Sequence, residues 1–179
     1  MPIILVGGSG RHVGKTSQVC GLNAALPEYE WLAVKVTSHA HGERDAVWEE
    51  TAAGQGTDTA RYLAAGARRA FLLTVTDAKQ PFAAIRAAIG TSPNLIFESN
   101  RIAGELKPDL CIGVLGGSEI ESKPSFATFL DRADALVITG DRELGGLKLS
   151  SSAKVFRLAR FGWISSEMIE WGRARLDLT

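Results

Sequence analysis

The sequence has no excess of charge of either sign. Its 179 residues include 20 Lys and Arg residues and 20 Asp and Glu residues, so the formal net charge is zero. A chain without a basic balance has no general electrostatic attraction for nucleic acid or for an acidic membrane surface. We therefore expect neither as a partner, and any anion-binding site must be local.

The sequence also has only two cysteines and no long apolar run. Cys20 and Cys111 lie in apolar stretches without the spacing of metal ligands, so we interpret them as buried, reduced thiols. No run approaches the roughly 20 apolar residues of a membrane span. The N-terminus lacks the basic region of a signal peptide. These absences favour a cytoplasmic protein.

The length and composition are typical of one globular domain. Apolar residues make up 45% of the chain and charged residues 22%. A chain of this size buries roughly 70% of its unfolded surface, which is enough for a proper core. No internal repeat, low-complexity tract or linker divides the sequence, so we expect a single domain over residues 1–179.

Short apolar strands alternate with helical stretches along the whole chain. The expected strands cover residues 3–7, 31–37, 70–76, 94–99, 109–116, 135–140 and 154–159. The expected helices cover residues 15–26, 57–67, 77–90, 124–133 and 165–175, with a shorter helix before Pro108. We interpret most of residues 38–56 as a long functional loop. The alternation predicts an α/β fold of three layers, with a mainly parallel sheet covered by helices on both faces. Ligands on such sheets bind at the carboxyl ends of the strands.

A glycine-rich loop, GGSGRHVGKTS, follows the first strand and opens the first helix at residues 7–17. Glycines permit the positive φ angles that turn successive backbone N–H groups inward. The helix N-terminus adds about half a positive charge. Lys15 would reach the terminal phosphates of a nucleotide, and the Thr16 hydroxyl would ligate Mg²⁺. The predicted phosphate-binding residues are Gly8, Ser9, Gly10, Arg11, His12, Val13, Gly14, Lys15, Thr16 and Ser17.

The loop is one residue longer than the common Walker A pattern, which has four residues between its first glycine and Gly-Lys-Ser/Thr. That spacing would place the first glycine at position 9, which is Ser9, whereas five residues separate Gly8 from Gly14. With this length, and with Val13 before Gly-Lys-Thr, the loop resembles that of dethiobiotin synthetase. That resemblance implies an ATP-dependent synthetase or phosphoryl-transfer enzyme.

A second resemblance covers roughly residues 3–115. The segments LAVKVTSHAHG at 32–42 and GTDTARYLAAGA at 56–67 resemble the molybdopterin-guanine dinucleotide biosynthesis adaptor, the MobB family. The matching residues are Val34, Lys35, His39, His41, Gly56, Asp58, Thr59 and Ala65-Gly66-Ala67, with Glu98 ending a later strand. The resemblance implies a slowly hydrolysing GTP- or ATP-binding protein that acts with a partner protein in molybdenum cofactor biosynthesis. Both families usually follow that glutamate with glycine, whereas this chain has Ser99-Asn100-Arg101.

Acidic residues near the strand ends are candidates for a magnesium site. Mg²⁺ binds through one or two carboxylates together with phosphate oxygens and water. The resemblance implies that Thr16, Asp58 and Glu98 hold the metal. Glu98 ends an apolar strand, where a carboxylate is costly unless it is paired or metal-bound, and it could also orient the attacking water or hydroxyl. A salt bridge for Glu98 and a helix cap for Asp58 are the alternatives.

Lys35 lies between two valines of the second expected strand and completes the catalytic candidates with Lys15 and Glu98. We favour a contact from Lys35 to phosphate or substrate over a lysine that only reaches solvent at the sheet edge. His39 and His41 either contact substrate or are ordinary surface residues. Further candidate anion contacts, each with the solvated surface as its alternative, are Arg44, Arg61 and Lys123.

Two features of the C-terminal part leave alternatives open. Asp141 follows the strand at 135–140, roughly where proteins of this class read the base, but the surrounding TGDR does not match the guanine-recognition signature. ATP and GTP are therefore both candidates. The apolar residues Phe161, Trp163 and Trp171 either form a homodimer interface or belong to the core.

Overall fold

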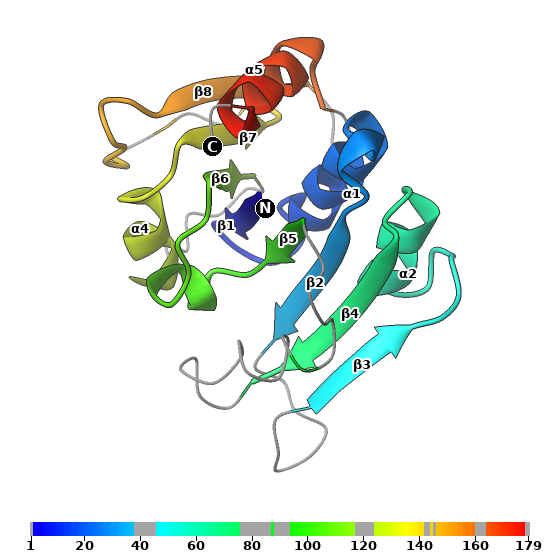
Figure 1. The fold of residues 1–179 in the computed structure, drawn as a ribbon. Helices are drawn as coiled ribbons and strands as arrows, with labels where there is room; N and C mark the ends of the chain where they lie inside the picture. The colour runs from blue at the N-terminus through cyan, green and yellow to red at the C-terminus, as the bar shows by residue number, and fades with distance from the viewer. Residues whose placement is uncertain are drawn as a thin grey trace.

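The computed structural model describes residues 2–37, 46–75, 87, 94–116, 124–141, 144, 146–159 and 164–177. These residues build one eight-stranded sheet in the order β3-β4-β2-β5-β1-β6-β7-β8 (Figure 1). The strands are β1 (Ile3–Gly8), β2 (Leu32–Thr37), β3 (Ala46–Glu50), β4 (Arg69–Thr74), β5 (Leu95–Glu98), β6 (Leu110–Leu115), β7 (Ala135–Thr139) and β8 (Lys154–Leu158). All neighbouring strands pair in parallel except β3 and β4, which confirms the mainly parallel sheet.

Helices cover both faces of this sheet. The α-helices are α1 (Lys15–Ala25), α2 (Asp58–Ala64), α4 (Pro124–Leu130) and α5 (Ser166–Leu176), and the 3-10 helices are η1 (Pro27–Tyr29) and η2 (Arg101–Gly104). Side chains from α1, α2 and α5 belong to one buried cluster, and side chains from α4 and η2 belong to the other. Figure 1 shows α1 and α4 on opposite sides of β1. The expected three-layer α/β fold is therefore confirmed.

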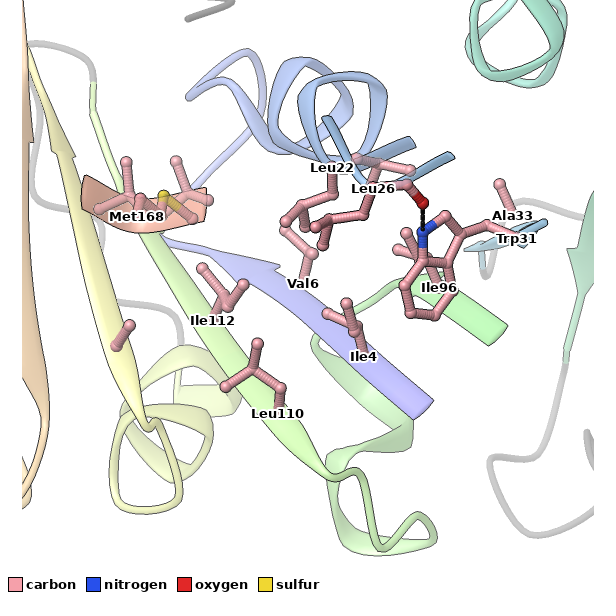
Figure 2. Packing of buried hydrophobic residues seen from close by; sticks show 14 of the residues in the cluster. Ile4, Val6, Leu22, Leu26, Trp31, Ala33, Ile96, Leu110, Ile112 and Met168 are labelled. Atoms are coloured by element: carbon pink, nitrogen blue, oxygen red, sulfur yellow. Dashed lines mark hydrogen bonds between the residues drawn. The ribbon is translucent and has the colours of Figure 1, made fainter. Parts of the chain in front are cut away.

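The central strands are apolar throughout because each of their faces is buried against a different cluster. In β1, Ile4 and Val6 pack on the side of α1, whereas Leu5 packs on the side of α4. Figure 2 shows Leu22 of α1 and Leu26, the C-cap of that helix, above Ile4 and Val6. The indole nitrogen of Trp31 donates a hydrogen bond to the Leu26 carbonyl at 2.9 Å. Alternate side chains of one strand thus serve two cores, which explains why the strand lacks a polar face.

One strand was not expected from the sequence. Residues 46–50, interpreted as part of a long loop, form the antiparallel edge strand β3. An edge strand has a neighbour on one side only, so it needs no continuous apolar run. The Val-Trp-Glu-Glu of β3 therefore gives no clear strand pattern in the sequence. Trp48 is 51% exposed, and Glu49 pairs with Arg69 of β4 at 2.6 Å.

The other boundaries agree with the expected elements to within a few residues at each end. Ser165 caps α5 by accepting a hydrogen bond from the Met168 amide, as one of the two expected serines should. The helix expected at 77–90, with Asp77 as its cap, lies outside the described residues apart from residue 87. Among the residues that the structure describes, no helix is long and apolar enough to cross a membrane.

Candidate functional site

The glycine-rich loop connects β1 to α1, as the sequence predicts. Gly14 is the N-cap of α1 and has a left-handed backbone with φ of 105°, and His12 shares the left-handed region with φ of 57°. No side chain caps this helix, and its first turn contains no acidic residue. The first N–H groups of α1 and the positive end of its dipole therefore have no competing side-chain anion from the helix itself.

Close packing explains why the loop begins with two glycines. A Cβ atom on Gly7 would lie 2.5 Å from the Phe129 ring and 2.7 Å from the Asn100 side-chain oxygen. A Cβ atom on Gly8 would lie 2.7 Å from the Lys15 side chain. Neither position has room for a side chain, so the start of the loop depends on glycine for space.

Hydrogen bonds attach the loop to strands on both sides of β1. The Asn100 side chain accepts from the Gly8 amide at 2.7 Å and donates to the Gly8 carbonyl at 2.8 Å, so one amide group holds both backbone groups of Gly8. On the other side, the Ser9 amide donates to the Val114 carbonyl of β6 at 2.9 Å. The Lys15 ammonium donates to the Gly10 carbonyl at 2.5 Å and so lies over the loop.

A buried carboxylate lies beside this loop. Glu98, at the end of β5, is 3% exposed. Its carboxylate accepts hydrogen bonds from the Thr16 hydroxyl at 2.8 Å, from the Lys35 ammonium at 2.8 Å and from the Tyr62 hydroxyl. These three donors offset the desolvation of the charge. The contact with Lys35 is the salt bridge that we gave as the alternative for Glu98, and its role in metal binding or catalysis stays a prediction.

The register of the sheet brings Lys35 and Glu98 together. The two residues are partners in the parallel pair β2–β5. Val34, Val36 and Phe97, their neighbours along each strand, pack into the cluster on the side of α4. Because side chains alternate along a strand, Lys35 and Glu98 both point to the face covered by α1 and α2.

Asp58 joins this group from the start of α2. Its carboxylate contacts the Lys35 ammonium and lies 3.6 Å from the Arg61 guanidinium. The capping of α2 falls to Thr57, whose hydroxyl accepts from the Ala60 amide at 3.1 Å, and so Asp58 is not the N-cap. Lys35 therefore bridges two carboxylates that come from different parts of the chain.

These contacts fix the protonation states of the group. Burial disfavours the charged form of Lys35, but the Glu98 charge and the hydrogen bonds to Asp58 and Glu98 raise its pKa. Burial also opposes ionisation of Asp58, yet the hydrogen bond and charge of Lys35 lower the Asp58 pKa. Burial, followed by the Glu98 charge, raises the pKa of Tyr62 well above its ordinary value. At neutral pH Lys35 is an ammonium, Asp58 is a carboxylate and Tyr62 is a neutral donor.

A cavity of about 700 Å³ opens over these residues. It is lined by Gly8, Gly10, Arg11, His12, Gly14, Lys15, Thr16, Ser17, Lys35, Val36, Thr37, Asp58, Arg61, Glu98, Ser99, Asn100, Arg101 and Ser125. All three catalytic candidates and all three metal candidates are on this wall. Of the ten predicted phosphate-binding residues, Ser9 and Val13 are buried and do not line it. We did not predict a role for Thr37, Asn100, Arg101 or Ser125, although the segment Ser99-Asn100-Arg101 follows Glu98 where the two families that the sequence resembles usually have glycine.

The predicted metal ligands supply oxygen donors of the kind that Mg²⁺ prefers, namely the Thr16 hydroxyl and the carboxylates of Asp58 and Glu98. The Lys35 ammonium contacts both carboxylates, so the two carboxylates already attract positive charge. A metal ion would have to share these carboxylates with Lys35. In the described part of the chain, no three His, Cys, Asp or Glu residues cluster closely enough to hold a metal. A magnesium ion here therefore needs the phosphates of a nucleotide to complete its ligands, and its site stays a prediction.

Two further candidates, Asp141 and Trp171, are described by the structure and do not line the cavity. Asp141 is exposed after β7 and does not line it. Trp171 is half-buried and packs edge-on against Phe156, with ring centres 5.3 Å apart. His39, His41, Arg44, Lys123, Phe161 and Trp163 lie outside the described residues.

The two thiols differ from each other in burial. Cys111 is 2% exposed, as expected, and burial raises its pKa to about 12. Cys20 is only half-buried, because it lies at the edge of the contact between α1 and α2, where its thiol contacts the Arg61 carbonyl. The expectation that both thiols are buried is therefore wrong for Cys20, although both are free.

Comparison with known proteins identifies the fold but no family. No family model and no curated protein matches the sequence. Among solved structures, the chain is similar to LpxK from Aquifex aeolicus, crystallised in its "apo" form in complex with ATP, with a TM-score of 0.55 and 17% sequence identity. The match covers 88% of this chain and 53% of that one, so the chain spans about half the length of LpxK. Together with the loop between β1 and α1 and the order of the sheet, this likeness shows a P-loop NTPase fold.

Proposed function

We propose that the protein binds a nucleoside triphosphate with Mg²⁺ on residues 8–17 and catalyses cleavage of its terminal phosphoryl group. One observation supports this above all. The phosphate loop, Lys15, Lys35, Glu98 and Asp58 surround one cavity of about 700 Å³. Cavities that bind small molecules and cofactors commonly have this size, and clustered ionisable groups with shifted pKa values are typical of catalytic sites.

The loop and Lys15 would bind the phosphates. The Lys15 ammonium, at 2.5 Å from the Gly10 carbonyl, lies where it can exchange that contact for a phosphate oxygen. The N–H groups at the start of α1 would donate to the same phosphates. When bound, Mg²⁺ would neutralise charge on the phosphate oxygens, held by the Thr16 hydroxyl and the carboxylates of Glu98 and Asp58.

Lys35 and Glu98 would act at the terminal phosphoryl group. Glu98 and Asp58 keep Lys35 charged, so its ammonium can stabilise negative charge that develops as the bond to that group breaks. The Glu98 carboxylate is fixed by three donors and is therefore suited to orient an attacking water or hydroxyl. Because LpxK was crystallised with ATP, we propose ATP as the nucleotide.

A nucleotide-dependent adaptor is the second candidate. Lys35, Asp58 and Glu98 are the charged residues on which the resemblance to the MobB family depends, and they form one group beside the phosphate loop. An adaptor would bind GTP or ATP, hydrolyse it slowly and turn over faster only with a protein partner, as in molybdenum cofactor assembly. An enzyme of the synthetase or phosphoryl-transfer type would instead accelerate with a small acceptor.

A fluorescence titration with labelled ATP and GTP, with and without Mg²⁺, tests the proposed function. We expect saturable, Mg²⁺-dependent binding that weakens about tenfold or more in Lys15→Ala, since a charged contact to phosphate is lost. The matched control is Lys107→Ala, because Lys107 is exposed and does not line the cavity. Absence of binding in folded wild-type protein, or equal binding in Lys15→Ala, contradicts the proposal.

A further inference from the structure

The described lining of the cavity extends beyond the phosphate loop. In the sheet, β5 and then β2 follow β1 on one side, whereas β6 and β7 follow on the other. Thr37 lies at the end of β2, and Ser99, Asn100 and Arg101 follow β5. The cavity therefore continues from the loop across the carboxyl ends of β5 and β2. We call this part the lateral pocket; its lining residues are Lys35, Val36, Thr37, Arg61, Ser99, Asn100, Arg101 and Ser125.

The lateral pocket contains a cation that the proposed nucleotide site does not use. Lys35 is paired with two carboxylates, and Arg61 lies 3.6 Å from Asp58. Arg101 is exposed, and none of the described residues provides its guanidinium with a hydrogen bond or an ion pair. An unpaired guanidinium on a cavity wall is a ready contact for a carboxylate or a phosphate group, which it can bind through two parallel hydrogen bonds.

The backbone at Arg101 is held firmly beside the loop. Its amide donates to the Ser99 hydroxyl at 3.0 Å, and the Ser99 amide donates to the Val6 carbonyl of β1 at 2.9 Å. Asn100 is bonded to both backbone groups of Gly8, and the next residue, Ile102, is fully buried. The starting point of the Arg101 side chain is therefore fixed relative to the phosphate loop, as a residue that positions a ligand requires.

We propose that the lateral pocket binds a second ligand, a small molecule with a phosphate or carboxylate group that Arg101 holds. Thr37 and Ser125 line the same cavity. The ligand would extend from Arg101 toward Lys35 and so toward the terminal phosphate. The interpretation of this ligand as a second substrate rests on the proposed function. The anion site itself rests only on Arg101 and its surroundings.

The test distinguishes the lateral pocket from the nucleotide site by first saturating the nucleotide site. The protein is saturated with Mg²⁺ and an ATP analogue that cannot be hydrolysed, and phenyl phosphate or benzoate is then titrated by calorimetry. We expect saturable binding of at least one probe that weakens about tenfold in Arg101→Ala, because a charge-assisted contact is lost, and less in Arg101→Lys. Affinity for the ATP analogue should change by less than about twofold in Arg101→Ala.

Arg157→Ala is the matched control, because it removes the same charge from an exposed position on the edge strand β8. It should leave probe binding unchanged. The inference is overturned if neither probe binds the saturated wild-type protein, if Arg101→Ala binds the probes as tightly, or if Arg157→Ala weakens them equally. It is also overturned if Arg101→Ala weakens the ATP analogue about tenfold, since Arg101 would then belong to the nucleotide site.

Failure of the proposed function gives a different result. If the wild-type protein does not bind the ATP analogue, the same probes are titrated without nucleotide. Probe binding that still depends on Arg101 then supports the anion site although the proposed function has failed, and probe binding independent of Arg101 overturns both. Thermal unfolding followed by circular dichroism establishes that each variant is folded.

Discussion

The two sides of β1 differ in the residues at their strand ends, although both sides support the same loop. On one side, β5 and β2 contribute Glu98 and Lys35, which are charged and joined by an ion pair. On the other side, Thr139 at the end of β7 is buried and donates to the Val13 and Leu115 carbonyls at 3.5 and 3.3 Å. Among the described residues, the first side contributes this ion pair to the cavity, and Thr139 on the second side bonds the loop through a neutral hydroxyl.

Neutral groups thus support the loop from both sides of β1, through Asn100 and Thr139, whereas the ion pair lies on one side. A neutral hydroxyl can be buried with modest partners, because an unmade hydrogen bond is its only penalty. A buried carboxylate needs several donors, and those donors must then be held in place by further groups. Residues on the charged side of β1 therefore depend on more partners. Substitutions there should lower the free energy of unfolding by more than substitutions on the neutral side.

The largest expected effect is the loss of Glu98. Glu98→Ala leaves Lys35, Thr16 and Tyr62 without their shared acceptor, so we expect the free energy of unfolding to fall by about 3 kcal/mol. Thr139→Val, on the neutral side, should lower it by about 1 kcal/mol. Urea unfolding measures both. Equal losses at the two positions would remove the distinction between the two sides of β1.

A smaller effect is expected at Asn100. Asn100→Asp keeps an acceptor for the Gly8 amide but sets a charged oxygen against the Gly8 carbonyl, so we expect nucleotide affinity to fall by about fivefold. Asn94→Asp is the matched control, because the Asn94 amide donates to the Tyr29 carbonyl and does not line the cavity. It should reduce stability and leave nucleotide affinity intact. A similar fall in affinity in both variants would mean that Asn100 acts only through general stability.

The smallest expected effect concerns the pH dependence of stability at Asp58. Because Lys35 lowers its folded-state pKa despite burial, the stabilisation by Asp58 is complete above about pH 4 and is lost as pH falls through that lower value. We expect Asp58→Asn to lower the free energy of unfolding by about 1 kcal/mol at pH 6, since solvent screens a side chain that is 32% exposed. The deficit should shrink toward pH 2.5. The same deficit at both pH values would show that the charge of Asp58 is not its cause.

Much of this architecture could be predicted because it depends on local patterns. Apolar runs predicted the central strands, and the glycine loop before Lys15 predicted the junction of β1 and α1. The strand β3 could not be found this way, since its residues follow no apolar pattern and its place in the sheet depends on pairing with β4.

The sequence predicted which residues belong to the candidate site, but it did not predict how those residues are arranged. The need of Glu98 for a partner follows from its place at the end of an apolar strand. Its pairing with Lys35, across a sequence separation of 63 residues, depends on the strand order and register. Asn100 gave only a weak signal, as a departure from a family pattern, because its role lies in two hydrogen bonds to Gly8, 92 residues away. Contacts at such separations appear only when the chain is folded.

The amide of Asn100 has a thermodynamic consequence. It joins Gly8 of the phosphate loop to the residue that precedes Arg101, so a shift of Gly8 on the proposed binding of nucleotide would act directly on the neighbour of the lateral-pocket arginine. Linkage between two binding equilibria is reciprocal. If bound nucleotide changed the affinity for a ligand at Arg101 by some factor, that ligand would change the affinity for nucleotide by the same factor. Such cooperativity would pass through one side chain, that of Asn100.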